Sequence, residues 1–284
     1  MMPDPRFTDQ PLDFWANVRT IGEAVGYTVR GKGLVKVPTQ TKIQTAYNKL
    51  GLTLAHLFGR RGSPTPVGQR MLDYFSFRAE TLNAYVEPRL MNVDRARNTF
   101  SKLREQLKPL CPLPMNKQKG AKKTHAYFTG IINMIIETNV AGIPCDYDPR
   151  KLTTVTHRGA PLRTLARRID GAFPRPVDPI AVWEIKEYYY TKTFGSRVAD
   201  GVYETLLDGM ELHELLASEN RKVLHYLFVD AHYTWWDCGR SYLCRILDML
   251  HMGFVDEVLF GYEVVERLPG IVKGWTKLAN KVGR

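Results

Sequence analysis

The sequence predicts a mixed α/β protein, in which an α+β mixed sheet flanked by helices follows a mainly helical N-terminal domain. Apolar residues recur at helical spacing through most of residues 12–107, whereas short apolar runs of strand length alternate with helical segments after residue 150. Between these parts, residues 108–123 contain three prolines and several lysines, which disfavour a regular helix. We therefore expect two domains, residues 1–115 and residues 116–284.

Positive charge is concentrated in the first part of the chain. The whole sequence has 40 Lys and Arg against 29 Asp and Glu, a net charge of +11. Residues 1–124 hold 21 basic and 9 acidic residues, whereas residues 125–284 hold 19 and 20. This asymmetry favours a polyanionic partner, and nucleic acid in particular, for the N-terminal domain. A solvated basic surface without a partner is the alternative.

Several classes of protein are disfavoured by composition and motifs. No apolar run is long enough to span a membrane, and we expect no secretion signal. No glycine loop of the ATP-binding type and no nucleophilic serine or cysteine constellation occurs. The four cysteines are scattered without a CxxC pair, so we expect reduced thiols in a cytoplasmic protein. They are Cys111, Cys145, Cys238 and Cys244.

The N-terminal domain is expected to contain a helix, a short strand and three further helices. Their predicted ranges are residues 12–29, 33–37, 39–50, 69–90 and 93–107. A glycine at Gly51 and a second apolar segment outline a helix-turn-helix over residues 39–58, although an ordinary helical hairpin has the same pattern. Arg60 and Arg61 lie in a Gly/Pro-rich loop, where they are candidate phosphate contacts or part of a solvated turn.

The C-terminal domain is expected to have the element order α-β-β-β-α-β-α-β. The predicted ranges are residues 125–139, 152–157, 163–173, 180–190, 197–217, 222–230, 239–252 and 254–260. Strands and helices that alternate in this way imply a mixed sheet with helices packed on its faces.

Two of these strands carry a possible catalytic group. Glu184 and Lys186 are two residues apart in a strand, so their side chains point to the same face. If the chain turns near residue 176, Asp170 lies opposite about residue 182 and faces the same way. Phosphodiester hydrolysis requires carboxylates that hold Mg²⁺ and a positive group that relieves charge on the phosphate. The three side chains therefore predict a metal-dependent phosphodiesterase, whereas a Glu/Lys pair on a solvated strand is the plainer alternative.

Asp170 followed by Glu184-Ile185-Lys186 resembles the PD-(D/E)XK nuclease superfamily, over roughly residues 125–262. The resemblance implies a restriction-endonuclease-like core. It also implies that Asp170 and Glu184 bind Mg²⁺, for which Mn²⁺ would substitute, and that Lys186 assists the attacking water.

Further residues follow from this resemblance or compete with it. A glutamate on the first core helix often adds a metal ligand in that superfamily, and Glu137 occupies that place here. Ile169 stands where the motif usually has proline. Asp178, in a proline-bounded turn, is a rival aspartate, and Glu187 is expected to face away from Lys186.

The junction between the last motif strand and the next helix is a further candidate for DNA binding. Lys192, Ser196 and Arg197 flank Gly195 there. Backbone N–H groups at the start of a helix bind phosphate well, although a plain capping loop explains the sequence equally.

The resemblance implies a Mg²⁺-dependent endonuclease that cleaves double-stranded DNA, most like a homodimeric type II restriction enzyme. A junction-resolving or DNA-repair nuclease of the same superfamily is one alternative. A DNA-binding regulator with an inactive nuclease-like core is the other.

Overall fold

The computed structural model describes residues 1–29, 33–59, 61–116, 124–191 and 195–282. Its helices are α1 (Leu12–Val25), α2 (Gln40–Leu50), α3 (Pro66–Glu80), α4 (Val93–Leu107), α5 (Tyr127–Asn139), α6 (Ser196–Glu219), α7 (Arg240–His251) and α8 (Glu263–Val282), with shorter helical segments η1 (Thr81–Val86), η2 (Glu87–Arg89) and η3 (Tyr233–Cys238). Its strands are β1 (Thr28–Val29), β2 (Leu34–Val35), β3 (Thr154–His157), β4 (Ala160–Thr164), β5 (Gly171–Phe173), β6 (Ala181–Glu187), β7 (Leu224–Asp230) and β8 (Glu257–Phe260).

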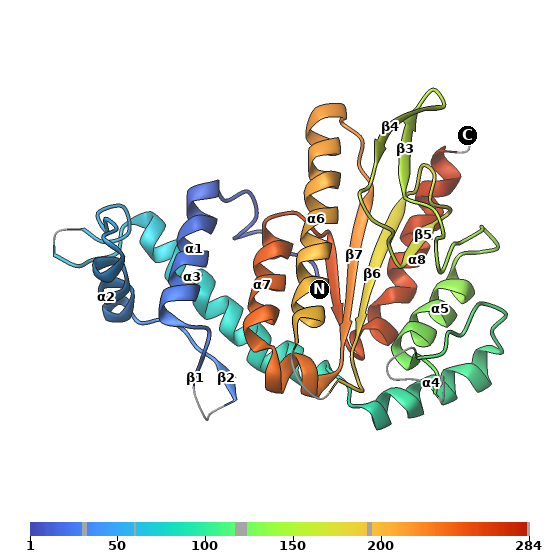
Figure 1. The fold of residues 1–284 in the computed structure, drawn as a ribbon, viewed down its shortest axis with the longest axis horizontal. Coiled ribbons are helices and arrows are strands. Elements are labelled where there is room, and N and C mark those ends of the chain that lie inside the picture. Colours follow the sequence, from blue (N-terminus) through green and yellow to red (C-terminus); the bar gives the residue numbers. More distant parts are fainter. Residues whose placement is uncertain (30–32, 60, 117–123, 192–194, 283–284) are drawn as a thin grey trace.

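The main sheet has four strands in the order β5-β6-β7-β8 (Figure 1). β5 and β6 are antiparallel neighbours, whereas β6, β7 and β8 run parallel. Parallel neighbours need long crossover connections, and α6 and α7 provide them. The expected mixed α/β class is therefore confirmed. Among the described helices, none is both long and apolar enough to cross a membrane.

Alternating side chains of the sheet enter two separate apolar cores. In β7, Leu227 and Val229 pack on one face with α7, whereas Tyr226 and Phe228 pack on the other face with α5 and α8. A sheet covered on both faces needs continuous apolar strands, and this explains why β7 and β8 are buried almost throughout.

Helix α8 was not among the expected elements. Its apolar residues Val264, Leu268, Val272 and Trp275 lie at helical spacing and are buried in the second core. The internal proline, Pro269, breaks the appearance of a helix in the sequence. The indole rings of Trp275 and Trp183 of β6 stack with centroids 5.6 Å apart, so α8 supports the strand that carries the motif.

The strand expected over residues 163–173 is divided in the structure. Its first part is β4, which pairs with β3 in a separate two-stranded sheet, and its last part is the short strand β5. Leu165 and Ile169, between these strands, are buried beneath the hairpin. The chain therefore leaves one sheet and enters another within this segment.

The expected helix-turn-helix is not formed. α2 ends at Leu50, its C-cap Gly51 adopts a left-handed conformation with φ 67°, and residues 52–58 contain turns instead of a second helix. The next helix, α3, begins only at Pro66, where Thr65 caps its N-terminus. α1, α2 and α3 instead pack around an aromatic core, so residues 39–58 contribute one helix of a bundle.

A buried ion pair joins the two halves of the chain. The guanidinium of Arg78 in α3 donates to both carboxylate oxygens of Asp248 in α7, at 2.9 and 3.0 Å, and the hydroxyl of Tyr74 donates to the same carboxylate at 2.6 Å. Arg78 and Asp248 are only 2% and 3% exposed. Each charge therefore depends on its partner.

We expect Asp248→Ala to lower the free energy of unfolding by about 3–5 kcal/mol, because the charge of Arg78 is then buried without a partner. Arg97→Ala, which removes an exposed pair with Asp94, should cost less than about 1 kcal/mol. Urea unfolding of both variants measures the difference. Equal, small losses would contradict a role for the buried pair in joining the halves.

Candidate active site

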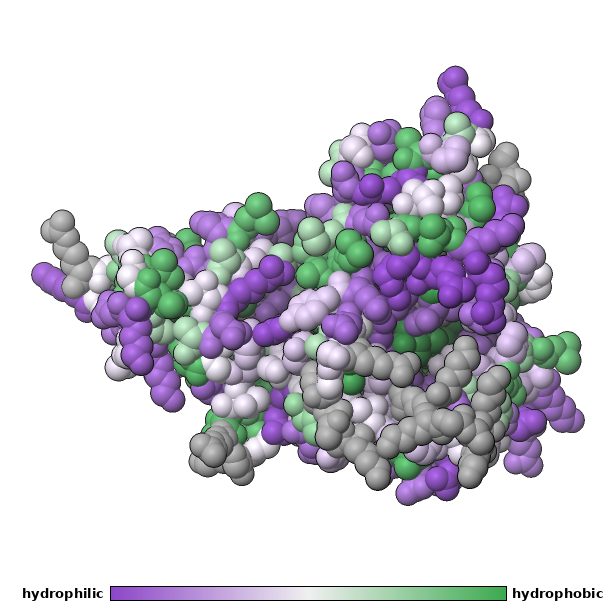
Figure 2. Space-filling view, viewed as in Figure 1, coloured by the Kyte–Doolittle hydropathy of each residue, from purple (hydrophilic) through white to green (hydrophobic). Residues whose placement is uncertain are grey.

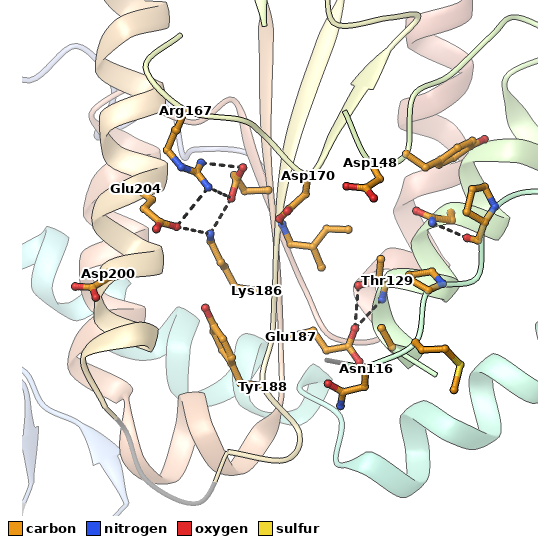
Figure 3. A pocket seen from close by; sticks show the side chains of 18 residues that line it. Asn116, Thr129, Asp148, Arg167, Asp170, Lys186, Glu187, Tyr188, Asp200 and Glu204 are labelled. Carbon is orange, nitrogen blue, oxygen red and sulfur yellow. Dashed lines mark hydrogen bonds and ion pairs between the residues drawn. The ribbon is translucent and has the colours of Figure 1, made fainter. Parts of the chain in front are cut away.

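A pocket of about 530 Å³ lies over β6 and between α5 and α6 (Figure 3). β5 contains only three residues, so the antiparallel edge of the sheet ends early and exposes the neighbouring part of β6. Figure 2 shows hydrophilic side chains gathered around a hollow on this face of the molecule. The pocket is therefore a polar opening at the edge of an apolar sheet.

The pairing of β5 with β6 brings the motif residues together. Gly171 pairs with Trp183, which places Asp170 one step further along and opposite Glu184. The sequence placed Asp170 opposite about residue 182; the shift of two residues preserves the face on which it lies. Asp170 accepts the backbone N–H of Ile185 at 2.7 Å, and this bond fixes its carboxylate beside the strand.

Glu184 and Lys186 form a buried ion pair in the pocket wall. The ammonium of Lys186 lies 2.7 Å from Glu184 Oε2, and the two residues are 5% and 0% exposed. Burial alone lowers the pKa of Lys186, but the carboxylates of Glu184 and Asp170 outweigh burial and raise that pKa above its ordinary value. Lys186 is therefore a cation at neutral pH.

Asp170 has the least compensated charge of the motif. Its carboxyl group opens to the solvent of the pocket, while protein atoms enclose its other sides. This partial enclosure, followed by repulsion from Glu184, raises the pKa of Asp170 to about 6. The carboxylate is consequently a group that a cation would stabilise.

Three charged residues that the sequence analysis did not select complete the site. Arg167 lies 2.9 Å from Glu184 Oε1 and 2.6 Å from Asp208 Oδ2. Glu204, one helical turn before Asp208 in α6, lies 3.3 Å from the ammonium of Lys186. The spacing of the two acidic residues on one helix face was visible in the sequence, but nothing in it showed that this face lies against β6.

The donor set suits Mg²⁺ in part. The cluster combines four carboxylates with two cations, so it has an excess of two negative charges when all four carboxylates are ionised, and a divalent ion would neutralise this excess. Asp170 and Glu184 are the two carboxylates of the expected motif, and a metal ion held by them would need water or other ligands to complete its coordination. In the described ranges no group of three or more His, Cys, Asp or Glu side chains is arranged to hold a metal.

Glu137 lies outside the pocket, contrary to the expectation for the first core helix. Its carboxylate accepts the backbone N–H of Leu110 at 3.0 Å. The residues of α5 that line the pocket are Thr129 and Asn133, and Thr129 is two turns, about 12 Å, before Glu137. Glu137 lies beyond both of these residues along α5 and does not line the pocket.

The competing acidic residues have other partners. Asp178 accepts the backbone N–H and the hydroxyl of Thr156, at 2.6 and 2.7 Å, and so anchors β3. Glu187 accepts the backbone N–H and the hydroxyl of Thr129, both at 3.0 Å, on the α5 side of β6. Asp178, the rival aspartate, is thereby separated from the Glu184–Lys186 pair. Glu187 lines another part of the pocket and faces away from Lys186, as expected.

Of the residues expected to contact phosphate, those whose side chains the structure describes do not line the pocket. Arg60 and Lys192 lie outside the described residues. Arg61 is exposed in the connection between α2 and α3. Ser196 begins α6, before the pocket residues of that helix, and Gly195 is its N-cap. The side chain of Arg197 lies outside the described part of the structure.

Comparison with known families divides the chain in two. A family described as a domain of unknown function, DUF7687, matches residues 91–275, which is more than half of the chain. The chain belongs to this family. A second family, the domain of unknown function DUF7690, matches residues 1–85. No curated protein and no solved structure matches the chain.

The DUF7687 region contains the whole pocket wall and begins just before α4. We expected the boundary near residue 115, after α4. In the structure, Ala96 and Phe100 of α4 belong to the core beneath α5, so this helix packs with the pocket-bearing half.

We expect Asp170→Asn to stabilise the protein by about 1 kcal/mol above pH 6.5 in the absence of metal. The folded pKa of about 6 lies above the ordinary 3.8, so ionisation of Asp170 lowers the stability of wild type as the pH rises from about 4 to 6. We expect a smaller gain than this pKa difference would give for a fully buried group, because the carboxyl group of Asp170 opens to solvent.

Unfolding by urea at pH 4.5 and pH 7 measures this effect. The advantage of the Asn variant should be small at pH 4.5 and complete at pH 7. Asp73→Asn, at an exposed position of α3, should change stability by less than about 0.5 kcal/mol at either pH. A gain that is independent of pH would contradict the repulsion between Asp170 and Glu184.

Proposed function

We propose that this protein is a Mg²⁺-dependent endonuclease that hydrolyses phosphodiester bonds of double-stranded DNA. The observation that carries the proposal is the convergence of Asp170, Glu184 and Lys186 on one pocket. Asp170 directly precedes β5, Glu184 and Lys186 lie in the antiparallel neighbour β6, and the pocket opens at the sheet edge. The chemistry and spacing of these groups are those implied by the resemblance to the PD-(D/E)XK superfamily.

The surrounding topology supports a restriction-endonuclease-like core. A helix precedes the motif strands, the two motif strands are antiparallel, and helical crossovers lead to two further parallel strands. This arrangement agrees with the helix, motif strands and following helix-strand order that suggested the superfamily.

Each charged group has a distinct role in this mechanism. A bound Mg²⁺ would supply charge neutralisation and an acidified water, and Asp170 and Glu184 would hold it. Lys186 carries a proton at neutral pH, so it stabilises negative charge on the phosphate and orients the attacking water through hydrogen bonds. Cleavage would leave 5′-phosphate and 3′-hydroxyl ends, as in the superfamily.

Within this class, a type II restriction enzyme is the reading we favour. Cleavage of both strands of a duplex needs two active sites, so we expect a homodimer acting in the cytoplasm. Preference for branched DNA would instead indicate a junction-resolving or repair nuclease.

One observation favours a DNA-binding regulator with an inactive core as a second candidate. Arg167 lies 2.9 Å from Glu184 Oε1, and Lys186 lies 2.7 Å from Oε2. Both oxygens of the expected ligand are thus engaged by cations. In an active enzyme, metal must compete with Arg167 for Glu184; in a regulator, this ion pair would be permanent.

We expect Lys186→Ala to reduce cleavage of plasmid DNA in Mg²⁺ at least about 100-fold, because charge on the phosphate is no longer relieved. Duplex binding should remain within about threefold, because one buried ammonium adds little to the contact surface. Lys222→Ala is the matched control, since Lys222 pairs with Asp256 away from the pocket. Cleavage unchanged in the Lys186 variant would contradict the assignment.

Calorimetric titration with Mn²⁺ separates the active enzyme from the regulator. Wild type should bind Mn²⁺ and release protons near pH 6, because a ligand carboxyl with a pKa of about 6 must ionise. Asp170→Ala should lose binding, whereas Asp178→Ala, which changes the rival aspartate, should retain it. Absence of Mn²⁺ binding by the wild type would favour the regulator.

A further inference from the structure

The hairpin of β3 and β4 belongs to a strongly basic segment that we call the basic arm, residues 149–169. The segment contains six Lys and Arg residues and not one Asp or Glu. The near-neutral average of the C-terminal half conceals this local excess. Its flanking residues, Asp148 and Asp170, both line the pocket, so the arm leaves the pocket wall and returns to it.

Half of these cations are neutralised by acidic residues outside the arm. Arg150 pairs with Asp148, Arg163 pairs with Glu214, and Arg167 belongs to the pocket cluster. The other three are exposed, and in the part of the chain that the structure describes no ion pair engages them. They are Lys151, Arg158 and Arg168.

The base of the arm is held rigidly. Val155 is 3% exposed and packs in a core with Leu212 and Leu215 of α6. The carboxylate of Asp178 accepts two hydrogen bonds from Thr156. The far end projects beyond the main sheet and has a hydrophilic tip (Figures 1 and 2), so the arm presents its tip as a fixed ribbon.

The tip has an unusual residue for its conformation. His157 pairs with Ala160 around a two-residue turn, and both turn residues have positive φ, 50° for Arg158 and 83° for Gly159. Such turns favour Asn or Asp followed by Gly, because other L-residues are strained at positive φ. The turn geometry by itself therefore does not favour arginine at position 158.

We propose that the basic arm holds double-stranded DNA beside the pocket, with Arg158 at its tip in the major groove. This inference rests on the proposed function and adds the surface that positions the substrate. The major groove of B-form DNA admits a two-stranded antiparallel ribbon, whereas the deep, narrow major groove of duplex RNA does not. Thr164 and Asp170 are six residues apart, at most about 20 Å of chain, so the near end of β4 lies close to the pocket.

The test measures binding to a labelled DNA duplex of about 20 base pairs by fluorescence anisotropy, with EDTA present so that no cleavage occurs. Arg158→Asn places the favoured Asn-Gly pair in the turn, so we expect a thermal midpoint equal to or above that of wild type. The same variant should bind duplex DNA about three- to tenfold more weakly. A residue with only a structural role would not combine these two changes.

The double variant Lys151→Ala/Arg158→Asn should weaken DNA binding more than about tenfold and reduce the slope of log K against log salt by about 1–2, because up to two phosphate contacts are lost. Lys277→Ala is the matched control, since Lys277 is exposed on α8 and does not line the pocket. It should bind as wild type does. Binding of duplex RNA should be weaker and insensitive to these changes.

The outcomes distinguish this inference from the proposed function. Duplex binding by the arm variants at wild-type strength would overturn the arm and leave the nuclease proposal standing. Equal losses for the arm variants and Lys277→Ala, or equal losses on duplex RNA, would also overturn it in favour of general charge attraction. Failure of the wild-type protein to bind any duplex would overturn both.

Discussion

The pairing of β5 with β6 is the constraint on which the rest of the site depends. Gly171 is required there, because a Cβ atom at this position would lie 2.0 Å from the indole of Trp183. That indole in turn stacks on Trp275 of α8. α8 therefore packs on the apolar face of β6, and the register between β5 and β6 places Asp170 beside Glu184 on the opposite face.

The charged side chains of β6 are buried, and the neighbouring charges of the pocket offset the cost of this burial only in part. Burial raises the pKa of Asp208 to about 7, and the charge of Glu184 adds to this effect; Asp170 is raised for similar reasons. Arg167 and Lys186 neutralise Glu184, which lowers its pKa below the ordinary value in spite of burial. Such perturbed groups gathered in one cleft are characteristic of functional sites.

The two halves of the chain are connected differently from what charge alone indicated. The N-terminal bundle is attached through the Arg78–Asp248 pair to α7, on the face of the sheet that also carries α6. The net basic charge of residues 1–124 favours a polyanion at that end, but the structure places an acid-free segment, residues 149–169, directly beside the pocket. The net charge of residues 125–284 is close to zero and therefore conceals the local excess of positive charge in residues 149–169. The acidic residues that balance this excess lie elsewhere in that half of the chain, for example on α6.

The sequence by itself determined the α/β class, most elements after residue 125, and the shared face of Asp170, Glu184 and Lys186. The shared face of Glu184 and Lys186 follows from the alternation within one strand. The face of Asp170 was predicted from an assumed turn near residue 176, and the structure keeps that face although the register differs by two residues. Only the tertiary structure decided that α8 supports β6, that Glu137 lies outside the pocket, and that Arg167 contacts acidic residues of α6. Those contacts depend on how helices settle on the two faces of the sheet, which no spacing within a single element encodes.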